Sequence, residues 1–408
     1  MLLSLRINNF KKFKDTGEIP LNKNVVFIGP NNSGKTTALQ ALTLWQYGIT
    51  KWLEKRGEKS KARTKTGVAI NRKDLLTIPV SSARYLWNDL NLKSNKGQNK
   101  VTIEITLKGI TRDKHWHCGM SFDYFGDEVI YCKPVDFKDN IIITEPDILK
   151  SIKIAYLPPM SGLSSREDKL MPASIMSRIG QGNTADVLRN LCYYLRYPEY
   201  HSQQLNNIEP GNNWNRFTQI VNDFFGITLA EPSLNERGEI EMYYKDEQGN
   251  LLELPSAGRG QQQIMLLLTL LLTNPETILL LDEPDAHLEI LRQKQVYKLI
   301  TELAAEKGSQ IIAASHSEVI LNEAAERDTV IAFLGKPHQI NDKGSQLLKS
   351  LTSIGFEQYY QAEQKRWVLY LEGSTDLAIL KKFASVLNHP VIKYLETAYV
   401  HYVSTNIP

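Results

Sequence analysis

Three short apolar runs stand out along the chain, and each is followed at once by a glycine or a polar residue. They are "VVFI" at 25–28, "ILLL" at 278–281 and "IIAA" at 311–314. Near-continuous apolar runs of this length are typical of central strands in a parallel sheet that is buried on both faces. Because ligands of such sheets bind beyond the carboxyl ends of the strands, the pattern predicts an α/β fold with its chemistry at these ends.

The middle of the chain has a different pattern. Residues 100–109 and 115–125 alternate between apolar and polar positions as strands do, and helix-like segments follow around 185–197. The stretch 90–250 lacks the heptad repeat of long coiled-coil arms, so we expect a compact protein. His115, His117 and Cys118 would suggest a metal site, but no fourth ligand stands at a suitable spacing, and alternation along a strand explains them better.

Composition adds a few limits. A chain of 408 residues with 42% hydrophobic residues predicts more than one domain, and a formal charge of +3 excludes a strong polycation. Three cysteines without a C-x-x-C pair suit a reducing cytosol. No apolar run reaches the roughly 18 residues that a membrane span needs, and the pattern of the first residues leads us to expect no signal peptide. We therefore expect a cytoplasmic protein without a membrane partner.

The first apolar run leads into a phosphate-binding loop. The spacing of "GPNNSGKTT" fits G-x-x-x-x-G-K-[ST] between a strand and a helix, as this motif requires, although a chance glycine turn would share the letters. Its backbone N–H groups and the helix N-terminus would cradle ATP phosphates, with Lys35 on the β- and γ-phosphates and Thr36 on Mg²⁺. The predicted nucleotide-binding residues are Gly29, Asn31, Asn32, Ser33, Gly34, Lys35, Thr36 and Thr37.

The other two runs supply candidate catalytic groups. Asp282 is predicted to hold Mg²⁺ through water, and Glu283 to polarise the attacking water. An acidic turn after a core strand is the alternative interpretation. His316 would contact the γ-phosphate, although a histidine at a strand end is often structural.

A second anion-binding helix is predicted at 254–272. Small residues and glutamines open a strongly apolar helix, so Ser256, Gly258 and nearby N–H groups would face an anion. Since the chain already has a phosphate loop, we expect this helix to read the nucleotide of another copy. A capped core helix without any ligand is the alternative.

The order of these motifs resembles the ATP-binding-cassette ATPases of the SMC and RecF type, and most closely the OLD (overcoming lysogenisation defect) family, bacterial ATPases many of which act in phage defence. The resemblance implies an ATPase domain over 1–340 with an insertion at about 90–250, and a helical linker at 341–365. It assigns to Ser256 a contact with the γ-phosphate bound by the partner, and places Asp285 and His287 at the dimer seam. The family's metal-sensing glutamine has no evident counterpart; Asn71, Arg72 and Asp74 stand in that stretch, where Arg72 also suits the surface.

The end of the chain, 366–408, resembles the first strand and helix of a Toprim domain, a metal-dependent nuclease or topoisomerase module. The matching residues are Glu372, which would bind the metal, with Gly373 and Asp376. A Toprim site also needs a later pair of aspartates, and none precedes Pro408. We therefore expect either a module that is cut short or a vestigial fragment that packs.

Two functions follow from the resemblance. In one, ATP closes a dimer or higher oligomer that controls nucleic-acid cleavage by Toprim sites. In the other, a sensor ATPase scaffolds an oligomer and holds or releases a separate toxic effector, with phage or reverse-transcribed DNA among the triggers. The stretch 51–65, with seven basic residues and two acids, would bind a DNA or RNA backbone or be a solvated loop. The energy subunit of a membrane transporter is disfavoured.

Overall fold

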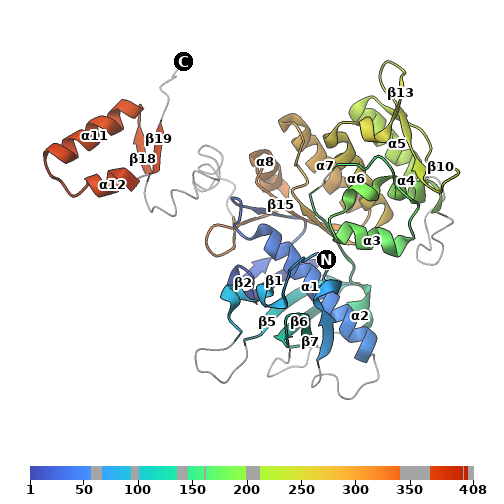
Figure 1. Cartoon of the computed structure of the whole chain (residues 1–408), viewed down its shortest axis with the longest axis horizontal. Helices are drawn as coiled ribbons and strands as arrows, with labels where there is room; N and C mark the ends of the chain where they lie inside the picture. The colour runs from blue at the N-terminus through green and yellow to red at the C-terminus, as the bar shows by residue number, and fades with distance from the viewer. Residues whose placement is uncertain are drawn as a thin grey trace.

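A computed structural model describes residues 1–56, 67–92, 101–135, 146–159, 162–198, 212–340, 368–397 and 399–402. Strands and helices are interleaved along the chain, and two six-stranded sheets form the framework (Figure 1). One sheet is antiparallel and the other is almost entirely parallel. The predicted α/β class is confirmed.

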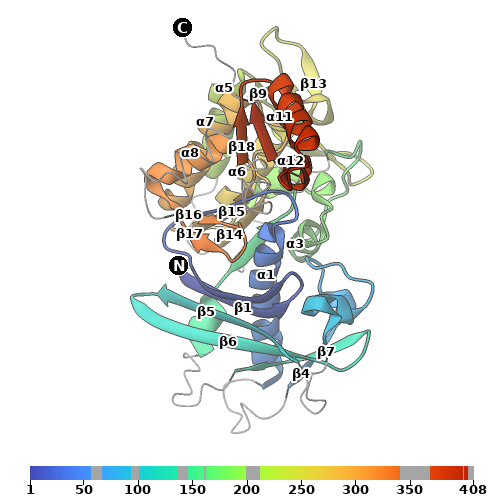
Figure 2. The same ribbon diagram turned by 90° about the vertical axis from the view of Figure 1, so that its left-hand side faces the viewer.

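The antiparallel sheet has the strand order β2-β1-β5-β6-β7-β4. Its strands span Phe13–Pro20, Leu2–Phe10, Ile103–Thr111, Lys114–Tyr124, Val129–Pro134 and Val68–Asn71, in that order. Apolar side chains alternate with polar ones and face helix α1 (Lys35–Arg56), which lies across the sheet (Figure 2). Trp45 of α1 donates its ring N–H to the carbonyl of Cys118 at 3.0 Å. On β6, His115 is exposed and Cys118 is buried, as alternation predicts.

The parallel sheet has the order β17-β16-β3-β15-β14-β8. Its strands span His338–Gln339, Thr329–Ala332, Val25–Ile28, Gln310–Ser315, Ile278–Asp282 and Ile154–Leu157, and only β17 runs antiparallel to its neighbour. Residues of β3 alternate between two cores: Val25 and Phe27 face α1 and the antiparallel sheet, whereas Val26 and Ile28 face the helical layer. The three apolar runs are therefore the three adjacent strands at the centre of this sheet.

The stretch 90–250, predicted from the sequence to be an insertion in the ATPase domain, contributes strands to both six-stranded sheets. Strands β5, β6 and β7 belong to the antiparallel sheet, since β5 pairs directly with β1 over Leu2–Asn8. Strand β8 forms the edge of the parallel sheet beside β14. These pairings join residues about a hundred positions apart, so hydrophobic patterns along the chain do not predict them.

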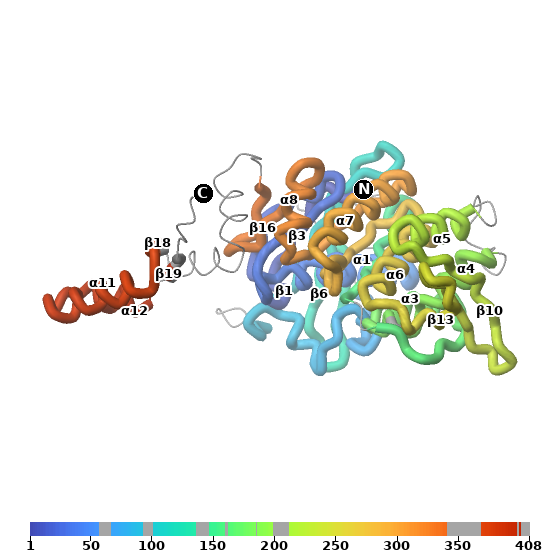
Figure 3. The backbone as a smooth tube through the Cα atoms, turned by 90° about the horizontal axis from the view of Figure 1, so that it is seen from above, coloured from blue at the N-terminus to red at the C-terminus, as the bar shows by residue number. Residues whose placement is uncertain are grey.

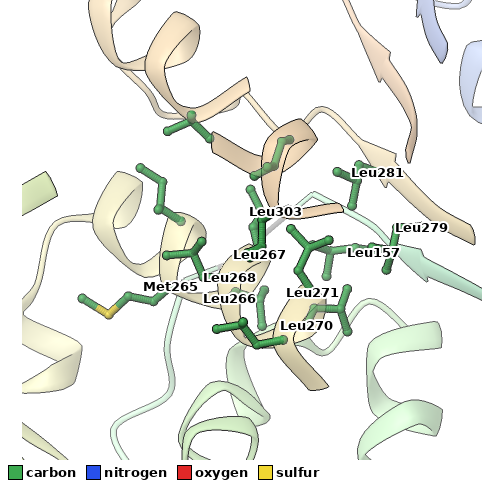
Figure 4. Close-up of a cluster of buried hydrophobic side chains, with 14 of the residues drawn as sticks. Leu157, Met265, Leu266, Leu267, Leu268, Leu270, Leu271, Leu279, Leu281 and Leu303 are labelled. Carbon is green, nitrogen blue, oxygen red and sulfur yellow. The ribbon is translucent and has the colours of Figure 1, made fainter. Parts of the chain in front are cut away.

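Helices α6 (Arg259–Thr273), α7 (Ile290–Glu306) and α8 (Glu318–Arg327) lie on the second face of the parallel sheet. Two further helices, α4 (Leu188–Arg196) and α5 (Asn212–Phe225), pack against α6. Figure 4 shows the leucines of α6 meeting Leu157, Leu279 and Leu281 of the sheet. Helix α3 (Pro172–Gly180) contacts β8 on this side of the sheet, whereas α2 (Pro146–Ser151) packs against α1 on the other side.

Short strands cover the outer side of the helical layer. Strands β9 (Thr228–Leu229), β12 (Tyr243–Lys245) and β13 (Leu251–Glu253) form one small sheet, and β10 (Ser233–Leu234) pairs with β11 (Ile240–Glu241). Strand β13 leads directly into the 3-10 turn Leu254–Ser256 and then into α6. The three-stranded sheet therefore connects directly to the start of the predicted anion-binding helix.

The C-terminal unit holds two parallel strands, β18 (Val368–Leu371) and β19 (Tyr399–Tyr402), joined by α11 (Ser374–Val386) and α12 (Ile392–Thr397). Figure 3 shows it apart from the two main sheets. The predicted linker 341–365 lies outside the described residues.

The tight packing of α6 leads to a stability prediction. Leu268 is fully buried, so Leu268→Ala would leave a cavity and lower the free energy of unfolding by about 3 kcal/mol. Leu251→Ala is the matched control, because that side chain is 60% exposed and its loss should change stability by less than about 0.5 kcal/mol. Urea unfolding followed by circular dichroism measures both; equal effects would contradict the packing described for α6.

Candidate functional site

The phosphate-binding loop connects β3 to α1. Gly29 has a φ of 149° and Gly34 a φ of 110°, and Asn32 adopts the left-handed region at 60°. A Cβ on Gly34 would lie 2.6 Å from the ring of Phe13, and one on Gly29 would lie 3.0 Å from the carbonyl oxygen of Phe333. Only glycine fits these positions, so the loop curls in front of the N-terminus of α1, where helix N–H groups favour an anion.

Lys35 is the first residue of α1, and its side chain is buried under this loop. Its ammonium donates to the carbonyl oxygens of Gly29 at 2.7 Å and Pro30 at 3.0 Å. Burial lowers the pKa of Lys35, and the carboxylates of Glu283 and Asp282 act in the opposite direction. The cation is thus held where the loop would bring phosphate oxygens.

Asp282, the last residue of β14, lies beside the loop. Its Oδ1 accepts a hydrogen bond from the Thr36 hydroxyl at 3.1 Å, and its Oδ2 accepts one from the Tyr156 hydroxyl at 3.1 Å. Burial raises the pKa of Asp282, and these two hydrogen bonds oppose that shift. Sequence analysis missed Tyr156, which comes from the edge strand β8; the pairing of β8 with β14 is the feature that reveals it.

The oxygen donors at this point fit Mg²⁺. A hydroxyl and a carboxylate already within hydrogen-bond distance are hard ligands, and Mg²⁺ prefers one or two such protein ligands together with water and substrate phosphates. Thr36 and Asp282 are the residues that would hold the ion, which would neutralise charge on the phosphates of ATP.

Glu283 and His316 lie together at the ends of β14 and β15. Glu283 adopts a left-handed backbone with a φ of 51°, and its N–H donates to the carbonyl of Ala314 at 2.8 Å. Its Oε1 lies 3.6 Å from His316 Nδ1, and both side chains are partly exposed. This distance and exposure leave the carboxylate able to accept a hydrogen bond from water, as a water-activating group must.

Asp285 is buried just beyond Glu283. Burial raises the pKa of its carboxyl group, and the Ser315 hydroxyl acts in the opposite direction. Its Oδ1 has no hydrogen-bond partner within the described part of the chain. His287, two residues on, is exposed and has a φ of 64°. The expected position of both residues at a dimer seam stays a prediction.

Ser256 ends the 3-10 turn before α6 and is exposed. Its hydroxyl donates to the carbonyl of Glu253 at 2.6 Å and lies 3.3 Å from the hydroxyl of Tyr244. The N–H of Gly258 donates to the side chain of Gln261 at 3.1 Å, which closes the first turn of α6. No hydrogen bond among the described residues joins Ser256 to the phosphate-binding loop of its own chain.

The candidates for the metal-sensing loop serve local structure instead. Arg72 donates to the carbonyl of Val80 at 2.8 Å and to both carboxylate oxygens of Glu128, at 2.7 and 3.0 Å. Asn71 accepts the N–H of Lys73 at 2.9 Å. Asp74 ends the same 3-10 turn, Arg72–Asp74. The Arg72 side chain is only 18% exposed, whereas that of Glu128 is 53% exposed, so a simple surface position does not describe Arg72.

At the C-terminal unit, Asp376 accepts the N–H of Gly373 at 2.9 Å and thereby caps α11. Neither Glu372 nor Asp376 belongs to a group of three or more potential metal ligands in the described part of the chain. In the basic stretch, Lys51 pairs with Glu54 at 3.1 Å, and residues 57–65 lie outside the described residues. None of the described helices is long and apolar enough to span a bilayer.

Two family models match the chain. One is described as an AAA domain and matches residues 4–169; the other is described as an AAA domain, putative AbiEii toxin, Type IV TA system, and matches residues 193–322. The first contains the phosphate-binding loop, and the second contains Ser256, Asp282, Glu283 and His316. Both segments are thus similar to AAA domains, and residues from the two segments meet at the site described above.

Individual proteins match more distantly. A segment of 74 residues is 38% identical to Phosphonates import ATP-binding protein PhnC 2 of Synechococcus sp. (strain JA-2-3B'a(2-13)) and covers 18% of this chain and 27% of that protein. The chain thus spans about a quarter of this curated relative.

Solved SMC head domains are also similar in fold. An SMC head bound to the C-winged helix domain of ScpA has a TM-score of 0.47 at 16% identity, covering 84% of this chain and 98% of that one. The SMC head domain from Thermotoga maritima has a TM-score of 0.43 at 15% identity, covering 84% and 99%.

The buried carboxyl group leads to a pH-dependent prediction. Because the folded-state pKa of Asp282 is raised, the ionised carboxylate favours the unfolded chain at any pH above its unfolded value near 4. Asp282→Asn removes this cost and should raise the melting temperature at pH 7 by about 2 °C. The advantage should shrink as the pH falls from the raised pKa toward 4.

Thermal melts between pH 4 and 8, without nucleotide or metal, measure this difference. Asp246→Asn is the control, because that exposed carboxyl group has a lowered pKa, set mainly by hydrogen bonds with Asn250. A lower melting temperature for Asp282→Asn across the whole range would contradict the assigned burial cost.

Proposed function

We propose that the protein is a bacterial anti-phage defence ATPase of the OLD type, which binds ATP and Mg²⁺ and closes into a dimer or higher oligomer through composite ATP sites. The observation that carries this proposal is the meeting of Lys35, Thr36, Asp282, Glu283 and His316 at one end of the parallel sheet. Such a set supplies phosphate binding, metal binding and water activation in one place.

In this proposal each residue has one task. The loop Gly29–Thr37 and Lys35 bind the phosphates, and Thr36 with Asp282 holds Mg²⁺. Glu283 orients and polarises the attacking water, and His316, which lies 3.6 Å from its carboxylate, contacts the γ-phosphate. Release of the γ-phosphate then removes the negative charge to which both the phosphate-binding loop and the Ser256 surface of a second copy would bind.

The exposed position of Ser256 supports the composite site. The start of α6 presents this hydroxyl and the N–H groups of the first helical turn to solvent, and the chain's own loop has a separate helix N-terminus for its phosphates. A second copy would bring its bound nucleotide to this surface. The exposed His287 belongs to the loop that packs against the same helix, so it would lie at the seam.

The output of the ATPase is proposed in two forms. In the first, closure of the oligomer controls cleavage of DNA or RNA by a Toprim module that contains Glu372. In the second, the ATPase scaffolds and releases a separate toxic effector. The match to a family described as a putative AbiEii toxin supports a defence or toxin–antitoxin setting for both. The use of Asp376 as a helix cap favours the second form.

Removal of the water-activating carboxylate tests the catalytic assignment. Glu283→Gln keeps the size and hydrogen-bonding reach of the side chain but cannot accept a proton. ATP turnover should fall by about 100-fold or more, while ATP binding persists and a dimer or larger oligomer accumulates. Phosphate release and light scattering measure the two effects, and Glu289→Gln, an exposed acid on the same loop, is the control. Turnover at the unmodified level would refute the role of Glu283.

A mixing experiment tests whether the site is shared between copies. Ser256→Arg blocks the anion-reading surface, and Lys35→Ala removes phosphate binding, so each protein alone should be inactive. A mixed dimer contains one complete site, with the loop from the Ser256→Arg chain and the serine from the Lys35→Ala chain. We expect partial recovery of turnover on mixing. Failure to recover in dimers shown by mass to be mixed would contradict the composite site.

A further inference from the structure

Gln263 makes a contact that none of the motifs explains. This glutamine lies in the second turn of α6 and is 3% exposed. Its amide nitrogen donates to the backbone carbonyl oxygen of Glu283 at 3.1 Å, whereas its amide oxygen has no partner within the described part of the chain. A buried amide that is left half satisfied costs free energy, so its single hydrogen bond needs an explanation.

The backbone of Glu283 is the group that this contact holds. A left-handed φ of 51° is unfavourable for a residue with a side chain and persists only where neighbours hold it. The N–H of Glu283 donates to the carbonyl of Ala314 at 2.8 Å, and its carbonyl accepts from the Gln263 amide and from the N–H of Ala286, each at 3.1 Å. Strand β15 and helix α6 therefore clamp the residue from two sides and aim its carboxylate.

A second contact joins the same helix to the following loop. A Cβ on Gly260 would lie 3.0 Å from the carbonyl oxygen of His287 and 3.0 Å from Cδ2 of Leu288. A side chain at this position would force the loop to shift, so the start of α6 and the loop after Glu283 pack closely.

Gln262 and Gln263 serve different loops. The side chain of Gln262 donates to the carbonyls of Ala257 at 2.8 Å and Pro255 at 3.2 Å, and so holds the turn that contains Ser256. Adjacent helix residues point about 100° apart, which turns Gln263 toward Glu283 instead. One helix thus holds both the surface for a partner's nucleotide and the carboxylate for its own.

We propose that Gln263 is a positioning residue for Glu283 of its own chain, although it lies on the helix that reads the nucleotide of a second copy. Loss of its N–H group leaves the Glu283 carbonyl held only from within its own turn, by Ala286, and removes the contact with α6 that keeps the carboxylate aligned with the attacking water. ATP binding does not depend on this contact, because within the described part of the chain the Gln263 side chain bonds to Glu283 and not to the phosphate-binding loop. The proposal rests on the proposed role of Glu283.

The first test uses single variants of the full chain. Gln263→Glu keeps the size of the side chain but removes the N–H donor, and Gln263→Met serves if that variant folds poorly. We expect kcat to fall about tenfold with the KM for ATP unchanged, as for the loss of one orienting hydrogen bond. Thr269→Val is the control: it is buried on the same helix, and among the described residues its hydroxyl bonds only to the carbonyl of Leu266.

Hydrogen exchange without nucleotide gives a readout that needs no turnover. Peptides covering 283–287 should exchange faster in Gln263→Glu than in Thr269→Val. Peptides covering the phosphate-binding loop should exchange at the same rate in both variants. Unchanged exchange at 283–287, or unchanged kcat, would overturn the proposal. Unchanged ATP turnover in Glu283→Gln would instead refute the role of Glu283 itself. Failure of the Gln263 proposal can therefore be told from failure of the proposed function.

The mixed dimer distinguishes two possible roles of Gln263, which are to position Glu283 and to support the turn that contains Ser256. Its single site uses Glu283 of the Ser256→Arg chain and Ser256 of the Lys35→Ala chain. Gln263→Glu on the first chain should lower turnover about tenfold relative to the same substitution on the second. Equal effects, or a larger effect on the second chain, would show that Gln263 acts through the signature surface or through general packing, and would overturn the proposal.

Discussion

The burial of one parallel sheet on both faces is the constraint on which the rest of the molecule depends. Successive residues of β3 point alternately into two hydrophobic cores, one shared with α1 and the antiparallel sheet and one shared with α6. The middles of these strands are therefore apolar, and the polar groups of the site collect at their carboxyl ends. The loop at Gly29, the carboxylates after β14 and the histidine after β15 come together for this reason.

That arrangement has an electrostatic cost, which the neighbouring groups offset only in part. Burial shifts the pKa of Lys35 down and the pKa values of Asp282 and Asp285 up, each in the direction that opposes the charged form. Opposite charges and the hydroxyls of Thr36 and Tyr156 counteract these shifts. Burying these charged groups lowers the stability of the fold but places them where a strongly charged ligand can interact with them. A polyphosphate with its metal ion is such a ligand.

Helix α6 connects the hydrophobic core to the Ser256 turn and to the Glu283 backbone, the two parts of the proposed ATP site that it contacts. Its leucines pack against the sheet, whereas its first turns hold the Ser256 turn through Gln262 and the Glu283 backbone through Gln263. A movement of this helix would change both contacts at once. The helix is therefore the element through which two sites in an oligomer would influence each other.

Local sequence by itself determined the parallel-strand core, the phosphate-binding loop and the acidic pair, because each depends on residues that are neighbours in the chain. Gly29, Gly34 and Lys35 act within one loop. An apolar run followed by Asp282 and Glu283 predicts a buried strand that ends in two carboxylates, whichever strands are its neighbours in the sheet. Only the tertiary structure decided that residues 103–134 complete the first sheet, that β8 brings Tyr156 to Asp282, and that Gln263 holds Glu283. These contacts join residues that are far apart in sequence, and their partners are backbone carbonyls or single hydroxyls, which leave no periodic pattern in the chain.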